Sequence, residues 1–435
     1  MDAYLLLALI LGSFIFLMFL GFPLAFSFLA VMLISSFLIM GPSHGFSFFL
    51  GGAFDSLTKF TLIPIPMFIL MGAILFHSGV ATRCINGISI WLGPVPGRLS
   101  ILANLTGGLM GLLSGSTLGT TGLLGTLLVP EMRKRGYSKA MTYGPILASG
   151  GLAMIIPPST LTVVFATIAH ISVGRLLLAC LIPGFLMVSF YLLQIIVRSI
   201  LNPSLAPKYE FAPSSFKEKI KSLLIDVLPL GLIIFLVTGL IVIGVATPSE
   251  AASTGALGAI ILTAAYGLLR WGIFVNALKE TVKLSVMIFM IISGSVVYSQ
   301  LLAYSGISRA ITQGLVGLEI PWITILIMML IVLVMGTMMD QIAIIMITVP
   351  VFIPVINALE FDPFLFGVLM LINLQIALTT PPIGMLLFVI KGISPEEVSM
   401  PDLYKSALPF IACDAVVMII IILIPSIALW LPGLP

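Results

Sequence analysis

The sequence predicts an all-α protein that crosses a membrane many times and contains an internal repeat of inverted topology. Three observations support this fold class. Of the 435 residues, 60% are hydrophobic and only 8% are charged, whereas soluble domains carry about 25% charge. Motifs of the first half recur in the same order in the second half, and the loops after matching segments differ in charge. At about 20 apolar residues per crossing, the chain has enough apolar sequence for roughly ten or more spans.

Composition also excludes several classes of protein. The net charge is +3, and no basic cluster indicates nucleic-acid binding. The three cysteines and three histidines are scattered, so neither a disulfide framework nor a zinc site is predicted. The phosphate-binding loop of ATPases does not occur. The N-terminus lacks a basic start and a small-residue cleavage site, so residues 5–20 are predicted to remain as the first span.

The first half predicts spans, one long interrupted stretch and one proline-broken stretch. Stretch 99–130 is too long for one span and is interrupted at 114–117, and stretch 140–171 carries Pro157-Pro158 near its centre. Between them, loop 131–139 is rich in lysine and arginine, which places it in the cytoplasm by the positive-inside rule. The remaining predicted elements are spans at 4–20, 22–41, 61–80 and 174–197, and a short amphipathic segment at 81–98.

The second half predicts a similar series after the polar segment 198–222, which is also predicted to be cytoplasmic. Stretch 321–358 is broken at Gly336-Thr337, and stretch 363–390 is broken between Thr379 and Pro382. Further spans are predicted at 223–246, 251–270, 281–304 and 406–431. The tetrad 247–250 predicts a capping box that opens a helix. With the basic loops inside, both termini are predicted to lie outside.

Four landmarks relate the two halves at an offset of about 220 residues. The matched segments are Ser114-Gly115-Ser116 with Met335-Gly336-Thr337, 127–130 with 347–350, Tyr143-Gly144 with Phe366-Gly367, and Ile156-Pro157-Pro158 with Thr380-Pro381-Pro382. Loop 131–139 has four basic residues and one acidic residue, whereas the matching loop 355–364 has two acidic residues and no basic one. The two copies are therefore predicted to face opposite sides of the membrane, as in many secondary transporters.

Each repeat is predicted to form a re-entrant hairpin followed by a broken helix. A long apolar stretch with a polar centre folds back at a tip whose free backbone groups need protein or water around them. The proline pair breaks the next helix, because proline lacks an amide donor and disfavours helix in the residue before it. Helix ends at both places offer carbonyl oxygens to a cation and amides to an anion.

Asp340 is the sharpest single candidate, because it is the only ionisable residue between Pro321 and Leu359. An intramembrane carboxylate is costly and indicates function by default. Ion coordination is the favoured interpretation, and a helix N-cap that stabilises the returning arm of the hairpin is the structural alternative.

Hydroxyl groups gather at both tips and both breaks. These residues are Ser114, Ser116, Thr117, Ser159, Thr160, Thr337, Thr379 and Thr380. Hydroxyl and carbonyl oxygens suit a small alkali cation, although serine and threonine also cap helix ends or bond to carbonyls of their own helix. The shortage of buried histidine, glutamate and lysine favours sodium over a proton relay. For the glycines near the first tip, a helix-packing face is favoured over ligand contact at Gly107, Gly108, Gly111 and Gly119, but not at Gly115.

Five segments resemble the large membrane subunit of tripartite ATP-independent periplasmic (TRAP) transporters, the DctM-like family. They read LLSGSTLGTTGLLGTLLVPEM, RGYSKAMTYGPILASGGLAMIIPPS, ATPSEAAS, MGTMMDQIAIIMITVPVFIPV and ALTTPPIGMLLFVIKGI. The resemblance covers nearly the whole chain. It departs from the expected pattern at the first tip, which reads SGST where a small residue and proline are expected after the serine. This difference bears on ion or substrate preference.

The resemblance implies a membrane subunit of a sodium-driven importer of organic acids, mostly carboxylates such as C4-dicarboxylates or sialic acids. It implies the ion-transporter superfamily fold with an elevator mechanism, in the bacterial inner membrane. The implied partners are a periplasmic substrate-binding protein and a small four-helix membrane subunit. The chain begins directly with the large-subunit pattern, so a fused small subunit is not expected. No enzymatic activity, catalytic residue or cofactor is expected, and Na⁺ is the only metal ion.

The family's ion and substrate residues carry over by position. The first sodium site is expected at Ser114, Gly115, Ser116, Gly151 and Pro157, and the second at Gly336, Thr337, Asp340, Thr379, Thr380 and Gly384. Substrate contacts are expected from Thr117, Pro158, Ser159, Thr160, Pro381 and Pro382.

The sequence divides into alternating scaffold and transport segments. The predicted segments are N-terminal scaffold helices and an arm (1–98), the first hairpin and broken helix (99–171), scaffold helices (172–304), a second arm (305–320), the second hairpin and broken helix (321–391), and a C-terminal scaffold helix (392–435). A stand-alone sodium-coupled symporter is the alternative function. An intramembrane enzyme using Ser116 or Asp340 is disfavoured, because no histidine or second carboxylate lies at either break. A non-transporting scaffold subunit leaves both helix breaks unexplained.

Overall fold

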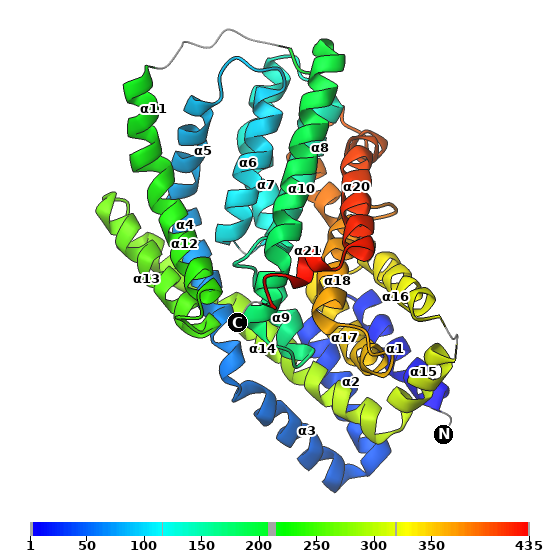
Figure 1. The fold of residues 1–435 in the computed structure, drawn as a ribbon. Coiled ribbons are helices and arrows are strands. Elements are labelled where there is room, and N and C mark those ends of the chain that lie inside the picture. The colour runs from blue at the N-terminus through cyan, green and yellow to red at the C-terminus, as the bar shows by residue number, and fades with distance from the viewer. Residues whose placement is uncertain (1–2, 115, 208–214, 318–319, 434–435) are drawn as a thin grey trace.

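The computed structural model describes residues 3–114, 116–207, 215–317 and 320–433, which form helices and no strand (Figure 1). The first-half helices are α1 (Ala3–Phe19), α2 (Leu24–Met40), α3 (Pro42–Leu57), α4 (Pro64–His77), α5 (Val80–Trp91), α6 (Arg98–Ser114), α7 (Thr117–Lys134), α8 (Lys139–Gly151), α9 (Thr160–Ile168) and α10 (Val173–Leu201). The others are α11 (Phe216–Ser222), α12 (Leu228–Val242), α13 (Pro248–Ala265), α14 (Trp271–Tyr304), α15 (Ile307–Val316), α16 (Pro321–Gly336), α17 (Gln341–Ala358), α18 (Pro363–Thr379), α19 (Met385–Ile393), α20 (Met400–Leu423) and α21 (Ser426–Leu429). The all-α fold is confirmed.

Six helical segments in the described part of the chain are long and apolar enough to cross a membrane. They are Phe60–His77, Val173–Leu201, Phe216–Val242, Trp271–Tyr304, Gln341–Ala358 and Met400–Leu423. Four shorter apolar helices accompany them, including α16 and α18, which each carry one side of a predicted interruption. The protein is therefore a multi-pass membrane protein, and the apolar helices α16 and α18 beside the predicted interruptions are shorter than a full crossing.

The structure adds helices where the sequence suggested none. α3 follows α2 directly and packs closely against it, since a β-carbon on Gly45 would lie 2.4 Å from the Ser36 carbonyl oxygen. α11 lies inside the predicted loop 198–222, where Ser215 and Glu218 form a capping box. Low hydropathy conceals both helices in the sequence, because tertiary packing and local capping stabilise them instead. The predicted capping box of Thr247 and Glu250 is confirmed at the start of α13.

Helix boundaries fix the register of the repeat. α7 and α17 each contain 18 residues, and Ser116 and Asp340 are their N-caps. Pro130 and Pro354 each lie four residues before the end of these helices. The sequence match of Pro130 with Pro350 was therefore wrong. That match relied on the Val-Pro dipeptide that both segments contain. An identical dipeptide is a weaker guide to the register of the repeat than the residue at which the helix starts.

Residues at equivalent positions of the two copies contact each other. Thr117 and Gln341, the first residues of α7 and α17, are hydrogen-bonded and lie 224 positions apart. Tyr191 of α10 and Asp414 of α20, 223 positions apart, are also hydrogen-bonded. Such contacts place a pseudo-two-fold axis between the copies, as expected for an inverted repeat.

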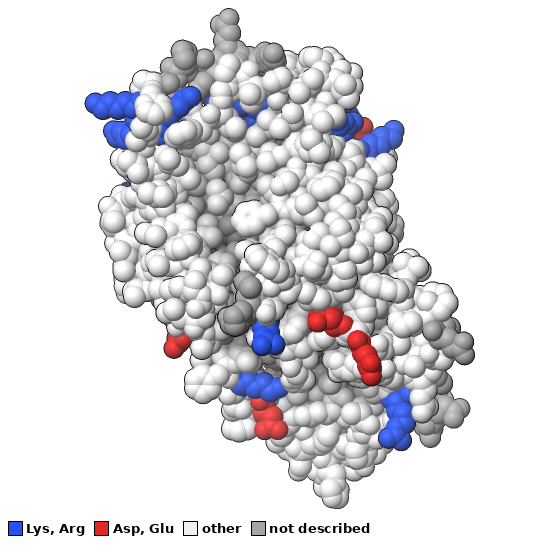
Figure 2. Space-filling model, viewed as in Figure 1, with Lys and Arg blue, Asp and Glu red and all other residues white. Residues whose placement is uncertain are grey.

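The predicted cytoplasmic loops gather at one end of the molecule. The Ser138 amide donates to the Leu205 carbonyl at 2.9 Å, and Lys139 pairs with Asp402 at 2.7 Å. Figure 2 shows lysine and arginine side chains concentrated at the end where α11 and the start of α8 lie. The turn between α17 and α18, which carries Glu360 and Asp362, lies on the opposite side (Figure 1). The arrangement agrees with the charge pattern of the sequence.

Candidate functional site

The first hairpin tip lies between α6 and α7. Ser116 caps α7, and its hydroxyl oxygen accepts the Gly119 amide at 3.1 Å. Thr117 is fully buried, and its hydroxyl group is hydrogen-bonded to the Gln341 side chain. Gly115 and the side chain of Ser114 lie outside the described residues, although α6 ends at Ser114.

The second tip contacts the second break directly. α16 ends at Gly336, Thr337 is its C-cap, and the Gly384 amide donates to the Thr337 carbonyl at 3.2 Å. Gly384 has φ +60° and precedes α19, and a side chain there would crowd two carbonyls of the preceding turn. Glycine is required at this junction, because other residues rarely adopt this backbone conformation.

Asp340 is the N-cap of α17, as the structural alternative proposed. Its Oδ2 accepts the Ile342 amide at 3.0 Å, and the residue is half-buried. It occupies in the second copy the position that Ser116 occupies in the first. A carboxylate has about four lone-pair sites, so this capping bond leaves acceptor capacity for a cation.

The first break is a compact, buried turn. α8 ends at Gly151 and passes through a short 3₁₀ turn, and Ser159 then caps α9. The Ser159 hydroxyl donates to the Met154 carbonyl at 2.8 Å, and the Thr162 hydroxyl donates to the same oxygen at 3.0 Å. The Pro157-Pro158 bond is cis, as is Pro381-Pro382 in the second break.

The hydroxyls at the second break bond to their own helix. Thr379 donates to the Ile376 carbonyl at 3.1 Å, and Thr380 donates to the same carbonyl at 2.6 Å. A hydroxyl that donates its proton still presents oxygen lone pairs. These groups therefore remain suited to a cation at the C-terminal end of α18, where the helix dipole is negative.

Three buried side-chain oxygens near the first break have no hydrogen-bond partner in the described part of the chain. They are Thr121 Oγ1 of α7, Thr160 Oγ1 of α9 and Gln375 Oε1 of α18. Thr121 packs against Gly150 and Gln375 against Gly151, both at the C-terminal end of α8. The unpaired hydroxyls of Thr121 and Thr160, beside a helix C-terminus, fit a cation better than an anion. The residues present are thus chemically compatible with sodium.

The predicted glycine packing face is confirmed for two residues. A β-carbon on Gly107 would lie 2.3 Å from the Ser149 side chain, and one on Gly111 would lie 2.8 Å from the Ala153 backbone. These glycines let α6 lie directly against α8 and the turn after it. The first tip is thereby held beside the first break.

Sequence reasoning missed four buried polar residues near these elements: Tyr191, Gln341, Gln375 and Asp414. Asp414 is the lone carboxylate in the apolar span near 406–431, which is the same signal that singled out Asp340. Gln341 and Gln375 carry no comparable signal, because an uncharged amide in an apolar stretch is common.

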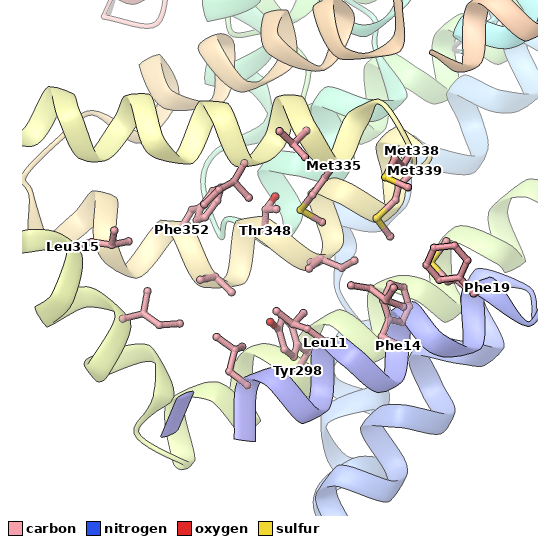
Figure 3. Close-up of a pocket in the computed structure, with 18 of the residues that line it drawn as sticks. Leu11, Phe14, Phe19, Tyr298, Leu315, Met335, Met338, Met339, Thr348 and Phe352 are labelled. Carbon is pink, nitrogen blue, oxygen red and sulfur yellow. The ribbon is translucent and has the colours of Figure 1, made fainter. Parts of the chain in front are cut away.

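A cavity of about 800 Å³ is not suited to an organic anion. It lies between α16–α17 and the group of α1, α14 and α15 (Figure 3). Its polar lining groups are the hydroxyls of Tyr298 and Thr348, and methionines and aromatic residues fill much of the rest. A carboxylate there would lack a charged partner, and its desolvation would be costly. The lining of this cavity therefore does not match the predicted substrate.

Comparisons with known proteins agree with this architecture. Residues 11–427 match the family model described as "Tripartite ATP-independent periplasmic transporter, DctM component". The chain belongs to the DctM family. It is similar to the C4-dicarboxylate TRAP transporter large permease protein DctM of Pseudomonas aeruginosa, with 31% identity over 87% of this chain and 88% of the relative. It is also similar to the sialic acid TRAP transporter large permease protein SiaM of Vibrio cholerae, with 30% identity over 96% of each chain.

Solved structures share the fold of this DctM-family permease. The Alcanivorax borkumensis YdaH transporter aligns with a TM-score of 0.65 over 90% of this chain and 89% of its own. Neisseria gonorrhoeae MtrF aligns with a TM-score of 0.62 over 95% of each chain. Both are 15% identical to this chain, so they support the fold alone.

Proposed function

We propose that this permease is the large subunit of a sodium-driven importer of an organic acid. The observation that carries the proposal is the contact between the Gly384 amide and the Thr337 carbonyl. This contact joins the second re-entrant tip to the second helix break. The ends of α16, α17, α18 and α19 therefore lie close to one another. The C-terminal ends of α16 and α18 favour a cation, and the N-terminal ends of α17 and α19 favour an anion. A sodium ion and a carboxylate can therefore bind side by side.

The first copy offers the matching arrangement with the C-terminal ends of α6 and α8 and the N-terminal ends of α7 and α9. We assign one sodium ion to each copy. Sodium is held by backbone carbonyls, by hydroxyls that donate elsewhere and, in the second copy, by Asp340. The substrate class follows from the relatives, whose names include C4-dicarboxylate, sialic acid and ectoine permeases. The relatives resemble this chain to similar degrees, so no single acid is favoured.

The partners are a periplasmic binding protein that delivers the acid and a small membrane subunit beside the scaffold. Both hairpins and both broken helices move as one unit in an elevator mechanism. The contacts of α10 and α20 favour placing them with this unit rather than with the scaffold to which the sequence assigned them. α20 packs on α8, and the buried Tyr191–Asp414 pair joins α20 to α10. The inner membrane of a bacterium is the expected location.

The test is uptake into proteoliposomes that contain the permease and the small subunit, with the binding protein outside. A panel of succinate, sialic acid and ectoine is offered with and without an inward sodium gradient. Uptake of one acid that requires both sodium and the binding protein is expected. Equal uptake without a sodium gradient would contradict sodium coupling. Uptake by the permease alone would establish the stand-alone symporter instead.

A further inference from the structure

We propose that Gln375 couples the two sodium sites, so that occupancy of one raises the sodium affinity of the other. This inference rests on the proposed function, because it concerns the same two sites. Gln375 belongs to the second broken helix, yet its side chain packs into the end of the first. It is a positioning residue that acts through the backbone of both breaks.

The contact with the first break is direct. Gln375 Nε2 donates to the Ala148 carbonyl at 3.1 Å, in the last turn of α8. A β-carbon on Gly151 would lie only 1.3 Å from Gln375 Oε1, so the amide occupies the space where a side chain at position 151 would be. The end of α8 cannot shift or rotate without displacing this amide, because both groups are fully buried.

The backbone of Gln375 contacts the second break. Its carbonyl group faces Thr379, which lies one helical turn later at the end of α18. The Thr379 hydroxyl, at the C-terminal end of α18, shares its proton between the Ile376 carbonyl at 3.1 Å and the Gln375 carbonyl at 3.3 Å. Sodium bound at Thr379 therefore acts on the turn that holds Gln375. Movement of that turn carries the side-chain amide against Ala148 and Gly151.

A third group holds the amide in place. The Tyr191 hydroxyl donates to Asp414 and lies beside the Gln375 amide. All three side chains are buried, which limits the movement of Gln375. A chain of packed and hydrogen-bonded groups with few alternatives can transmit a local change between sites.

The helix α18 supplies a matched control. Asn373 is also a buried amide, and its Nδ2 donates to the Met329 carbonyl at 2.6 Å. Met329 belongs to α16, so this bond stays within the second copy and does not cross to the first. Loss of either amide removes one buried hydrogen bond of the same type, but only Gln375 joins the two copies.

The experiment measures sodium-dependent thermal stabilisation of the purified permease, together with sodium-dependent uptake by the reconstituted complex. The variants are Gln375→Met, which keeps length and volume, and Gln375→Asn, which keeps the amide but shortens its reach. Asn373→Leu is the control. We expect the Hill coefficient for sodium to be about two in the wild type, which is the number of sites. We expect it to fall to about one in both Gln375 variants. Asn373→Leu lowers stability without changing the Hill coefficient.

Cooperative sodium binding that persists in Gln375→Met and Gln375→Asn would overturn the coupling. Non-cooperative binding in the wild type would overturn it too, while leaving sodium-driven transport intact. A wild-type protein without any sodium response would overturn both the coupling and the proposed function.

Discussion

Thr117 and Gln341 form a reciprocal hydrogen-bonded pair at the junction of the two hairpin tips. Gln341 Nε2 donates to Thr117 Oγ1 at 2.8 Å, and the Thr117 hydroxyl donates to Gln341 Oε1 at 3.2 Å. Each residue opens the second arm of its hairpin, and each is buried. The two tips are thereby fastened to each other, which favours their movement as one body.

Breaking this pair from one side is expected to destabilise the protein. Thr117→Val leaves the Gln341 amide buried without its partner, at a cost of about 1–3 kcal/mol. The double variant Thr117→Val with Gln341→Leu removes both polar groups and is expected to be less destabilised than the sum of the single variants. Thermal unfolding in detergent measures the three values.

Thr126→Val serves as the control for this cycle. Thr126 lies on the same helix and is exposed, and its hydroxyl donates to the Gly122 carbonyl of its own helix. Its replacement is expected to change stability by no more than about 0.5 kcal/mol. If the stability losses of Thr117→Val and Gln341→Leu simply add in the double variant, the pair does not join the tips.

Asp340→Asn is expected to weaken sodium dependence while the protein still folds. Asparagine caps a helix nearly as well as aspartate, so the loss is specific to the charge. If Asp340 holds sodium, half-maximal uptake requires at least about tenfold more sodium, equivalent to about 1.4 kcal/mol. A sodium titration of uptake measures the shift.

Asp362→Asn is the matched control, because Asp362 caps α18 at the turn outside the hairpin. Its sodium titration is expected to match that of the wild type. A normal titration in Asp340→Asn as well would assign Asp340 to helix capping alone.

The buried pair of Tyr191 and Asp414 is expected to respond asymmetrically to substitution. Tyr191→Phe leaves the buried carboxyl group without its hydroxyl donor, so stability falls by about 1–3 kcal/mol or more. Asp414→Asn keeps an acceptor for the Tyr191 hydroxyl and is expected to cost less. Melting temperatures of the two purified variants decide the order, and equal losses would indicate that the hydrogen bond contributes little.

Topology is testable by labelling single cysteines in a background without Cys84, Cys180 and Cys413. The basic loops are expected in the cytoplasm and both termini in the periplasm. A cysteine at position 217, in the basic segment of α11, is expected to resist an impermeant reagent added to whole cells. Lys208, a second labelling position in segment 198–222, lies outside the described residues. Labelling from outside at position 217 would reverse the assigned orientation.

The elevator mechanism predicts that contacts between hairpins and scaffold change during transport. Met339, beside the second tip, and Leu11 of α1 line the same cavity. A cysteine pair at these positions is expected to crosslink in one state only, and the crosslink is expected to stop uptake. Crosslinking to the same extent in inward and outward states, with uptake retained, would argue against sliding of the hairpins past α1.

The sequence by itself determined the class of fold, the repeat and its breaks. Hydropathy, the Pro157-Pro158 and Pro381-Pro382 pairs and the charge of the loops are local properties, and each restricts the backbone or the side of the membrane directly. The family motifs could also be recognised in the sequence, because they occupy these same segments. Sodium was favoured by the hydroxyl groups, by the scarcity of buried titratable residues and by that resemblance. The substrate class followed from the resemblance alone, and both stay predictions.

Only the tertiary structure decided the register of the repeat and the partners of its buried polar groups. Pro130 corresponds to Pro354 because α7 and α17 start at equivalent residues, a fact that similar dipeptides obscured. Thr117 meets Gln341, and Gly151 receives the Gln375 amide, because the two copies pack across a pseudo-two-fold axis. The sequence cannot specify such pairs, because a buried amide is satisfied by whichever group packing brings within reach, and that group lies more than 200 residues away.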